Sequence, residues 1–168
     1  MVLASFHVAE RSEDRSVLHA PPAQRPGGLV ADGWSGLFER RYAPSPAPER
    51  TLAWLRLGED LGADRALHAC ALTYLADDIF DDPVIALLGL QRPAPESLAG
   101  DDESILTQSL DYSLWFHRPP RADDWLLLDY SCRTFANACA TVVGEAFDSS
   151  GVHLATMAQQ VLVRATRL

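Results

Sequence analysis

The side chains of this chain that could do chemistry are aspartates and a glutamine set among apolar residues. Asp77 and Asp78 end an apolar run that repeats at helical spacing. Gln159 lies in an alternating run, on the same face as Met157 and Val161. An amide on an apolar face must find hydrogen-bond partners or cost about 1–3 kcal/mol. A carboxylate can accept a proton from a water molecule that hydroxyl and amide groups orient, so these residue types could supply hydrolysis by an activated water.

The same residues also have structural interpretations. Asp77 belongs to an acidic cluster with Asp78, Asp81 and Asp82, and runs of charge are usually solvated. Asp78 is the nearer rival as a base, because it points about 100° around the helix from Asp77. Gln159 could equally be a structural amide that the sheet satisfies.

Other familiar catalytic groups are weaker candidates. His117 stands at the end of a predicted strand beside Arg118, which favours a structural role or a contact at the edge of the substrate site. His68 lies over two helical turns before Asp77, too far away to form a dyad with it. No Gly-x-Ser-x-Gly sequence occurs, which argues against an acyl-serine hydrolase.

Composition limits the partners of the protein. The 168 residues fit one domain, and 48% hydrophobic with 22% charged residues is typical of a globular protein. A formal net charge of −9 argues against a non-specific nucleic-acid binder. Contacts to phosphate groups would have to come from local arginines such as Arg118, Arg121 or Arg133.

Three cysteines, without metal-type spacing, are most simply reduced thiols in a cytoplasmic protein. We expect neither a metal nor an organic cofactor. The first ten residues lack the pattern of a signal peptide, and no run approaches the ~18 apolar residues of a membrane span. We therefore expect no membrane association.

The elements that must position these groups follow from periodicity. We predict one helix over residues 64–78, capped by Asp64, with an apolar stripe of Leu67, Cys70, Ala71, Tyr74 and Leu75. A proline-rich linker covers residues 10–33, and residues 81–103 form an excursion with one helical turn. A hairpin turn is expected at 148–151. Strands are predicted over 2–8, 37–42, 51–57, 110–116, 125–132, 139–147 and 152–164. This pattern is typical of an α+β fold in which an antiparallel sheet wraps a long central helix.

Three segments carry a resemblance to a known family: HACALTYLAD at 68–77, SLDYSLWFHRP at 109–119 and GVHLATMAQQVLVR at 151–164. Together they resemble the second half of the type II acyl-CoA thioesterases, which carry two hotdog folds in one chain. The resemblance implies a hotdog fold in which Asp77, Ser109 and Gln159 hold the attacking water. The family more often has threonine at the position of Ser109.

Strict alternation fits Ser109 less well than the other two residues. It places Ser109 with Asp111 and Ser113, opposite Leu110 and Phe116. Ser109 therefore reaches the site only if the strand begins with a bulge or if that face looks toward the site.

The resemblance also suggests a domain organisation. Residues 1–33 resemble the closing strand of a first hotdog and the crossover linker, and residues 34–168 form the hotdog thioesterase domain. The chain is then either an N-terminally incomplete double hotdog or a single hotdog that pairs with itself or with another hotdog domain.

The expected function is hydrolysis of acyl-CoA to free fatty acid and CoA. Two alternatives remain open. The chain could be a non-catalytic hotdog subunit or fragment that completes an oligomer, or a hotdog enoyl-CoA hydratase, whose His/Asp pair has no evident counterpart here.

Overall fold

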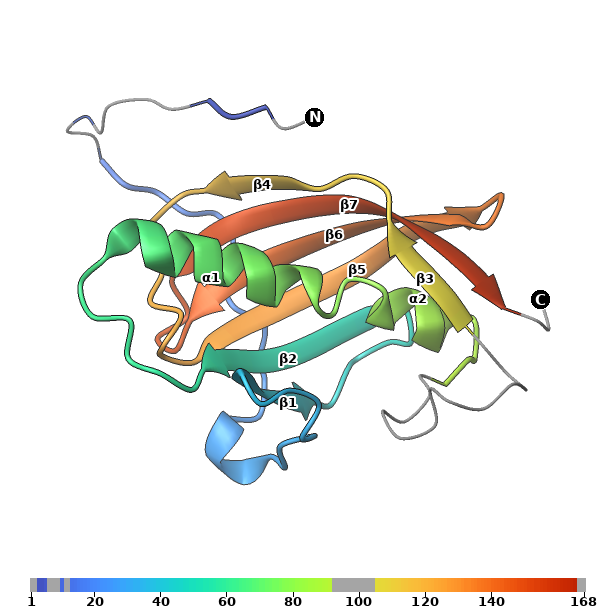
Figure 1. Ribbon diagram of the computed structural model, residues 1–168, viewed down its shortest axis with the longest axis horizontal. Helices are drawn as coiled ribbons and strands as arrows, with labels where there is room; N and C mark the ends of the chain where they lie inside the picture. The colour runs from blue at the N-terminus through green and yellow to red at the C-terminus, as the bar shows by residue number, and fades with distance from the viewer. Residues whose placement is uncertain (1–2, 6–9, 11–12, 92–104, 166–168) are drawn as a thin grey trace.

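A computed structural model describes residues 3–5, 10, 13–91 and 105–165 of the chain. Its main feature is a curved antiparallel sheet that wraps around a long helix, α1 (Figure 1). The strands follow the order β1-β2-β5-β6-β7, and β3 and β4 both pair with β7. Their bounds are β1 Phe38–Ala43, β2 Arg50–Leu57, β3 Ile105–Ser109, β4 Ser113–Phe116, β5 Leu126–Ala136, β6 Cys139–Asp148 and β7 His153–Ala165. The predicted α+β arrangement is confirmed.

Helix α1 spans Arg65–Asp77 and begins where the sequence predicts. The Asp64 carboxylate accepts hydrogen bonds from the backbone N–H groups of Ala66 (2.9 Å) and Leu67 (3.2 Å), which satisfies two otherwise unpaired donors. A short helix, α2 (Asp82–Leu87), is the helical turn expected after it. The rest of that predicted excursion lies mostly outside the described residues.

The buried face of α1 differs from the predicted stripe. Leu67 and Tyr74 are 46% and 54% exposed, and Cys70 is also exposed. The buried residues of the helix are instead His68, Ala71, Leu72, Leu75 and Ala76. The helix is apolar over much of its circumference, so periodicity alone offered two faces, and packing against the sheet selects between them.

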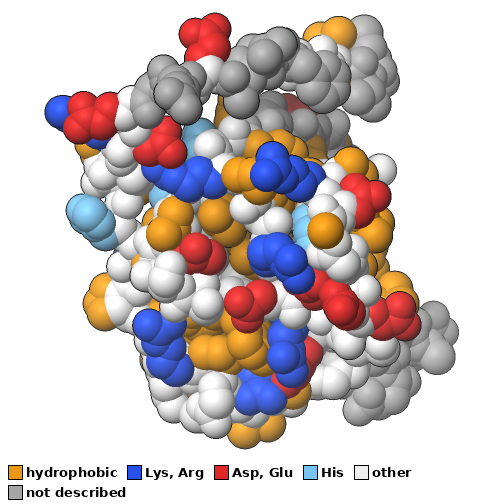
Figure 2. Space-filling view, turned by 90° about the vertical axis from the view of Figure 1, so that its left-hand side faces the viewer, with side chains coloured by type: hydrophobic (Ala, Val, Ile, Leu, Met, Phe, Trp, Pro, Cys, Tyr) orange, Lys and Arg blue, Asp and Glu red, His pale blue; other side chains and the backbone are white. Residues whose placement is uncertain are grey.

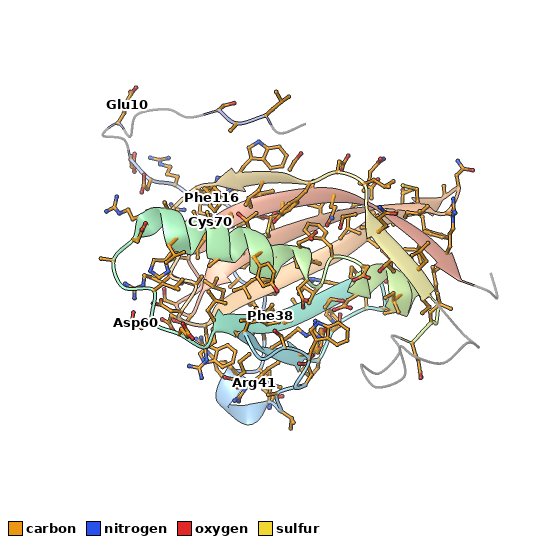
Figure 3. All side chains as sticks on the ribbon, in the orientation of Figure 1. Glu10, Phe38, Arg41, Asp60, Cys70 and Phe116 are labelled. Carbon is orange, nitrogen blue, oxygen red and sulfur yellow. The ribbon has the colours of Figure 1, made fainter. Side chains whose placement is uncertain are left out.

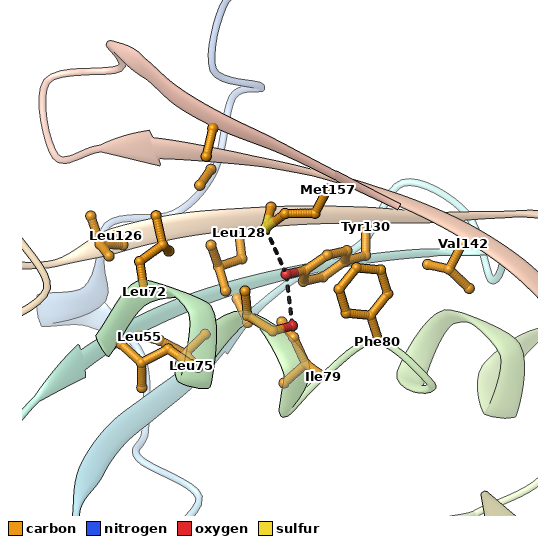
Figure 4. Close-up of a cluster of buried hydrophobic side chains, with 14 of the residues drawn as sticks. Leu55, Leu72, Leu75, Ile79, Phe80, Leu126, Leu128, Tyr130, Val142 and Met157 are labelled. Atoms are coloured by element: carbon orange, nitrogen blue, oxygen red, sulfur yellow. Dashed lines mark hydrogen bonds between the residues drawn. The ribbon is translucent and has the colours of Figure 1, made fainter. Parts of the chain in front are cut away.

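The core lies between α1 and the concave face of the sheet. Leu72, Leu75, Phe80, Tyr130 and Met157 are among its largest buried side chains (Figure 4). These side chains pack the helix against strands that are distant in sequence, and such close packing holds α1 rigidly on the sheet.

The convex face carries a smaller apolar cluster of Trp54, Leu127 and Phe147. Part of the predicted linker, residues 20–29, packs on this cluster, and the Trp54 indole N–H donates to the carbonyl of Gln24 (2.8 Å). The described part of the linker is irregular except for one 3₁₀ turn, η1 (Pro26–Gly28). Residues 20–29 therefore lie against the convex face of the sheet. The strand predicted over residues 2–8 lies largely outside the described residues, and residues 3–5 are not in a strand.

The strand predicted over 110–116 forms only from Ser113 onward, as β4, and β3 (Ile105–Ser109), which precedes it, was not predicted. β3 ends at Ser109, paired with Val161, and β4 begins at Ser113, paired with Ala158. Four residue steps on this side thus face three steps on β7, which leaves one extra residue, as in a bulge. The Asp111 carboxylate accepts from the backbone N–H of Gln160 (2.7 Å), in place of a backbone carbonyl.

The last hairpin forms as predicted. Asp148 Oδ1 accepts from the backbone N–H groups of Ser150 and Val152 (both 2.9 Å), and Gly151 has a φ of +91° that suits glycine. β5 continues to Ala136, beyond the predicted end at residue 132. Within the described part of the chain, no helix has both the length and the apolar character needed to span a membrane.

Candidate functional site

The three residues suggested by the resemblance meet at one carboxylate oxygen. Asp77 Oδ1 accepts a hydrogen bond from Ser109 Oγ (3.1 Å) and another from Gln159 Nε2 (2.9 Å). The three side chains come from the end of α1, the end of β3 and the middle of β7. The break after Ser109 places this residue at the site, which strict alternation alone did not.

Asp77 and Ser109 open onto a pocket of about 290 Å³ beside the end of α1. The described lining residues are Tyr74, Asp77, Asp78, Phe80, Asp81, Thr107, Gln108, Ser109 and Val161. Gln159 is only 1% exposed and does not line this pocket. It therefore holds Asp77 from the core side, while Ser109 holds it from the pocket side.

The neighbouring aspartate has a different environment. Asp78 forms an ion pair with Arg40, which is 4% exposed and also pairs with Asp32 (2.5 Å). Burial alone would lower the pKa of Arg40, but Tyr42, Asp32 and Asp78 raise it above its ordinary value. A buried, paired guanidinium fixes Asp78 as a structural group. The hydrogen-bond donors to Asp77 are, by contrast, neutral.

A hydrogen bond from Tyr130 attaches the C-terminal end of α1 to the sheet. The Tyr130 hydroxyl donates to the carbonyl of Ala76 (2.9 Å), the residue before Asp77 (Figure 4). The Tyr130 ring packs against Gly144, where an added Cβ would lie 1.9 Å from a ring carbon. Burial first, then the nearby Tyr112 and Asp77, raise the pKa of Tyr130 well above its ordinary value. Sequence reasoning missed this contact, although a glycine inside a strand is a signal of close approach.

Two buried polar atoms near the site make no hydrogen bond to the described residues: the Tyr112 hydroxyl and Gln159 Oε1. The Tyr112 ring packs edge-on against Phe80, with centroids 5.5 Å apart. Burial, followed by the charge of Asp77, raises the pKa of Tyr112 above its ordinary value. Both residues lie against the core beside Asp77, and sequence reasoning did not single out Tyr112.

The remaining candidates lie elsewhere. His68 is a core residue: it accepts from the Ala122 N–H at Nδ1 (3.2 Å) and reaches the Gly62 carbonyl with Nε2 (3.1 Å). His117 bonds to Thr156 on the convex face, so it is separate from the pocket. Arg118 donates to the His153 carbonyl (2.9 Å), and Arg121 pairs with Asp123 (3.0 Å).

On the face of the molecule shown in Figure 2, arginine and acidic side chains are interspersed. Several described arginines are paired with acids, among them Arg41 and Arg56, which share Glu39. No group of three or more His, Cys, Asp or Glu in the described part of the chain could hold a metal ion. The site is thus a carboxylate with neutral donors beside an open pocket.

A sheet that wraps one long helix, with a polar site at the end of that helix, defines a hotdog domain. Residues 13–163 match the family described as acyl-CoA thioesterase C-terminal domain, and the chain belongs to this family. Among curated relatives, acyl-coenzyme A thioesterase 8 of Homo sapiens is 29% identical over 128 residues, 72% of this chain and 37% of the relative. The Rattus norvegicus protein of the same name is 28% identical over 69% of this chain and 33% of its own length.

Solved structures agree with this fold. An acyl-CoA thioesterase II from Mycobacterium marinum matches with a TM-score of 0.71 and 27% identity, over 95% of this chain and 60% of that one. A protein of unknown function with a hot dog fold from Alicyclobacillus acidocaldarius matches with a TM-score of 0.69 and 18% identity, over 93% and 58%. The predicted hotdog fold is confirmed. The chain spans about a third of the length of the curated relatives it matches.

Proposed function

We propose that this domain hydrolyses acyl-CoA thioesters, with Asp77 as the general base. The observation that carries the proposal is the convergence of Ser109 Oγ and Gln159 Nε2 on Asp77 Oδ1 beside a pocket. Two donors on one oxygen fix the carboxylate plane and leave Oδ2 without a hydrogen bond from the described residues. A fixed carboxylate with one available oxygen is suited to accept a proton from water.

The reaction follows from this geometry. A water in the pocket donates a proton to Asp77 while its oxygen attacks the thioester carbonyl carbon. The tetrahedral intermediate then collapses, the C–S bond breaks, and the CoA sulfur leaves with the proton that Asp77 returns. Because Ser109 donates its own proton to Asp77, its oxygen lone pairs can accept from the same water.

The proposed substrate class, acyl-CoA thioesters, rests on family membership. The site itself is suited to hydrolysis at a carbonyl carbon and does not specify the nucleotide part of the substrate. The net charge of −9 gives no long-range attraction for an anionic CoA. Binding would have to rely on local contacts at the rim of the site. All three cysteines are free, which suits a reducing compartment, and we propose a cytoplasmic location.

The partner is a second hotdog domain. Among the described strands, β3 and β4 pair on one side only, with β7. The surface around these strands includes α1 and β4, on which Cys70 and Phe116 are labelled in Figure 3. Exposed apolar side chains lie on α1, on β3 and β4, and between these two strands: Leu67, Tyr74, Leu106, Leu110, Trp115 and Phe116. An unpaired strand edge beside apolar surface is an association site.

Asp77 itself is exposed in the single chain, so a second domain on this surface would enclose the reacting groups. The second domain is either a first hotdog, of which residues 1–33 would supply the closing strand and crossover, or another copy of this chain. For the chain alone we expect self-association, with turnover per chain falling as the protein is diluted. Light scattering and rate measured across one dilution series test this expectation. A stable monomer with concentration-independent turnover would contradict it.

The test of function is release of free thiol from acyl-CoA substrates of different chain length. We expect thiol release with a matching amount of free acid. Loss of enoyl-thioester absorbance without thiol release would identify a hydratase instead. Absence of both reactions in the assembled protein would identify a non-catalytic subunit.

A further inference from the structure

Only one end of the Gln159 side-chain amide, its nitrogen, has a hydrogen-bond partner among the described residues. Its Nε2 donates to Asp77 Oδ1 (2.9 Å), and a carboxylate can only accept, so the amide nitrogen must face Asp77. The amide oxygen, Oε1, then points away from Asp77 into the core, where no described residue donates to it. Among the described residues, only the bond to Asp77 therefore opposes rotation of this amide.

Among the described residues, the Tyr112 hydroxyl is the other buried side-chain group without a hydrogen-bond partner, and the sheet places it next to Gln159. Ser113 pairs with Ala158, so Tyr112, one residue earlier, comes beside Gln159, one residue later on the antiparallel strand. Both side chains are on the core side: Tyr112 packs on Phe80, and Gln159 lies between Met157 and Val161, which are core residues.

The two orphan atoms are chemically complementary. Burial and the charge of Asp77 raise the pKa of Tyr112, so the phenol keeps its proton at neutral pH and is a donor. Gln159 Oε1 is an acceptor. A buried donor and a buried acceptor on neighbouring positions of one sheet face satisfy each other if they are joined.

We propose that Tyr112 donates to Gln159 Oε1 through one bridging water, and so forms a relay from Tyr112 through Gln159 to Asp77. Tyr112 is then a positioning residue: it locks the amide so that Nε2 always faces the carboxylate. The role in turnover rests on the proposed function, whereas the hydrogen bond itself does not.

The relay makes a distinct kinetic prediction for Tyr112→Phe. One hydrogen bond corresponds to about tenfold in rate, so kcat should fall about tenfold with KM nearly unchanged. Asp77 would also lose a steady donor, so the acidic limb of the kcat profile should move to higher pH. Tyr112→His, whose imidazole N–H can donate, should recover part of the loss. Tyr42→Phe is the matched control, because it removes a hydroxyl that bonds Asp82 (2.6 Å). It should leave the acidic limb in place.

Two further measurements keep the proposal testable. In a Gln159→Ala background, Tyr112→Phe should cause no additional loss of turnover, because the relay is already cut. Independently of activity, hydrogen exchange of the Gln159 side-chain amide, followed by NMR, should be faster in Tyr112→Phe than in wild type and in Tyr42→Phe. Thermal unfolding verifies that each variant is folded. Unchanged amide exchange in a folded Tyr112→Phe variant would overturn the relay, whether or not the protein hydrolyses thioesters. Absence of thiol release in the wild type, with accelerated exchange in the variant, would overturn the proposed function alone.

Discussion

Strand β7 carries a polar cluster on each of its faces, and the two clusters differ in how completely they are satisfied. On the concave face, Gln159 belongs to the cluster around Asp77. On the convex face, Thr156 donates to Glu145 Oε2 (2.6 Å), and His153 Nε2 reaches the same oxygen (2.7 Å). His117 Nε2 completes the convex cluster with a bond to Thr156 Oγ1 (3.0 Å).

The convex cluster joins three strands: β4 through the adjoining His117, β6 through Glu145 and β7 through His153 and Thr156. Each of its four side chains makes a hydrogen bond within the cluster. The concave cluster leaves two buried atoms without a partner among the described residues and opens Asp77 to a pocket. His117, His153 and Thr156 also line a pocket, so the difference between the clusters is in their hydrogen bonds. The mutually bonded convex cluster stabilises the sheet, whereas the incompletely satisfied concave cluster has groups available for chemistry.

The largest expected difference between the two clusters comes from replacing one carboxylate in each by an amide. Asp77→Asn should lower turnover by about 10²–10⁴, the usual contribution of a general base, and leave thermal unfolding nearly unchanged. Glu145→Gln should keep turnover and lower thermal stability, because an amide replaces the charged acceptor of two donors. Thiol release and a melting curve on both variants check the comparison. Asp78→Asn is a further control, and loss of turnover there with retention in Asp77→Asn would move the base by one residue.

The two donors to Asp77 should rank by burial. Gln159→Ala removes a buried donor to a charged group, and we expect a loss of roughly 10–100-fold in turnover with some loss of stability. Ser109→Ala should be milder, because this residue is exposed and water can replace its hydroxyl. Ser109→Thr keeps the hydroxyl and should retain turnover. An inactive, folded Ser109→Thr variant would exclude a role for the hydroxyl at this position.

Gly144 and Glu145 are adjacent on β6 but face opposite sides of the sheet, which gives a structural version of the comparison. Gly144→Ala would drive a Cβ to within 1.9 Å of the buried Tyr130 ring, which holds the end of α1. We expect a loss of about 1–3 kcal/mol in the free energy of unfolding, measured by urea denaturation. Gly36→Ala, with no atom within 4 Å of the added Cβ, is the control and should be nearly neutral. A Gly144→Ala variant as stable as the control would show that Tyr130 has room to move.

The smallest expected effect is a change in the pH dependence of stability, caused by His117 of the convex cluster. Burial first, and then the nearby His153 and Arg118, lower the pKa of His117, although Glu145 opposes the shift. The folded state thus favours neutral His117, so its contribution to stability is present above the ordinary pKa of about 6.5 and is lost as pH falls through the lowered value. His117→Gln should therefore reduce the decline in stability between about pH 7 and pH 5. Urea midpoints across that range test it, and parallel pH profiles for both proteins would contradict it.

Local sequence determined the helix, most of the strands and the last turn, whereas β3 was not predicted. Asp64 caps α1 and Asp148 forms the last turn because each carboxylate bonds backbone groups a few residues away. The strand predicted over 51–57 forms as β2, in which Leu55 faces the core and Trp54 packs on the convex face. Motif resemblance supplied Asp77, Ser109 and Gln159, and the structure brings their side chains together, while their catalytic roles stay predictions.

Tertiary structure decided what periodicity left open. Packing against the sheet selected the buried face of α1, which leaves Tyr74 exposed and Asp77 within hydrogen-bond distance of Ser109 on β3. The extra residue between β3 and β4 brought Ser109 to the site, and Arg40, a partner from a distant strand, assigned Asp78 a structural role. Tyr112 and Gln159 became neighbours only through strand register. Each of these outcomes depends on contacts between residues far apart in the chain, and local hydrogen bonds and hydrophobic periods carry no information about such contacts.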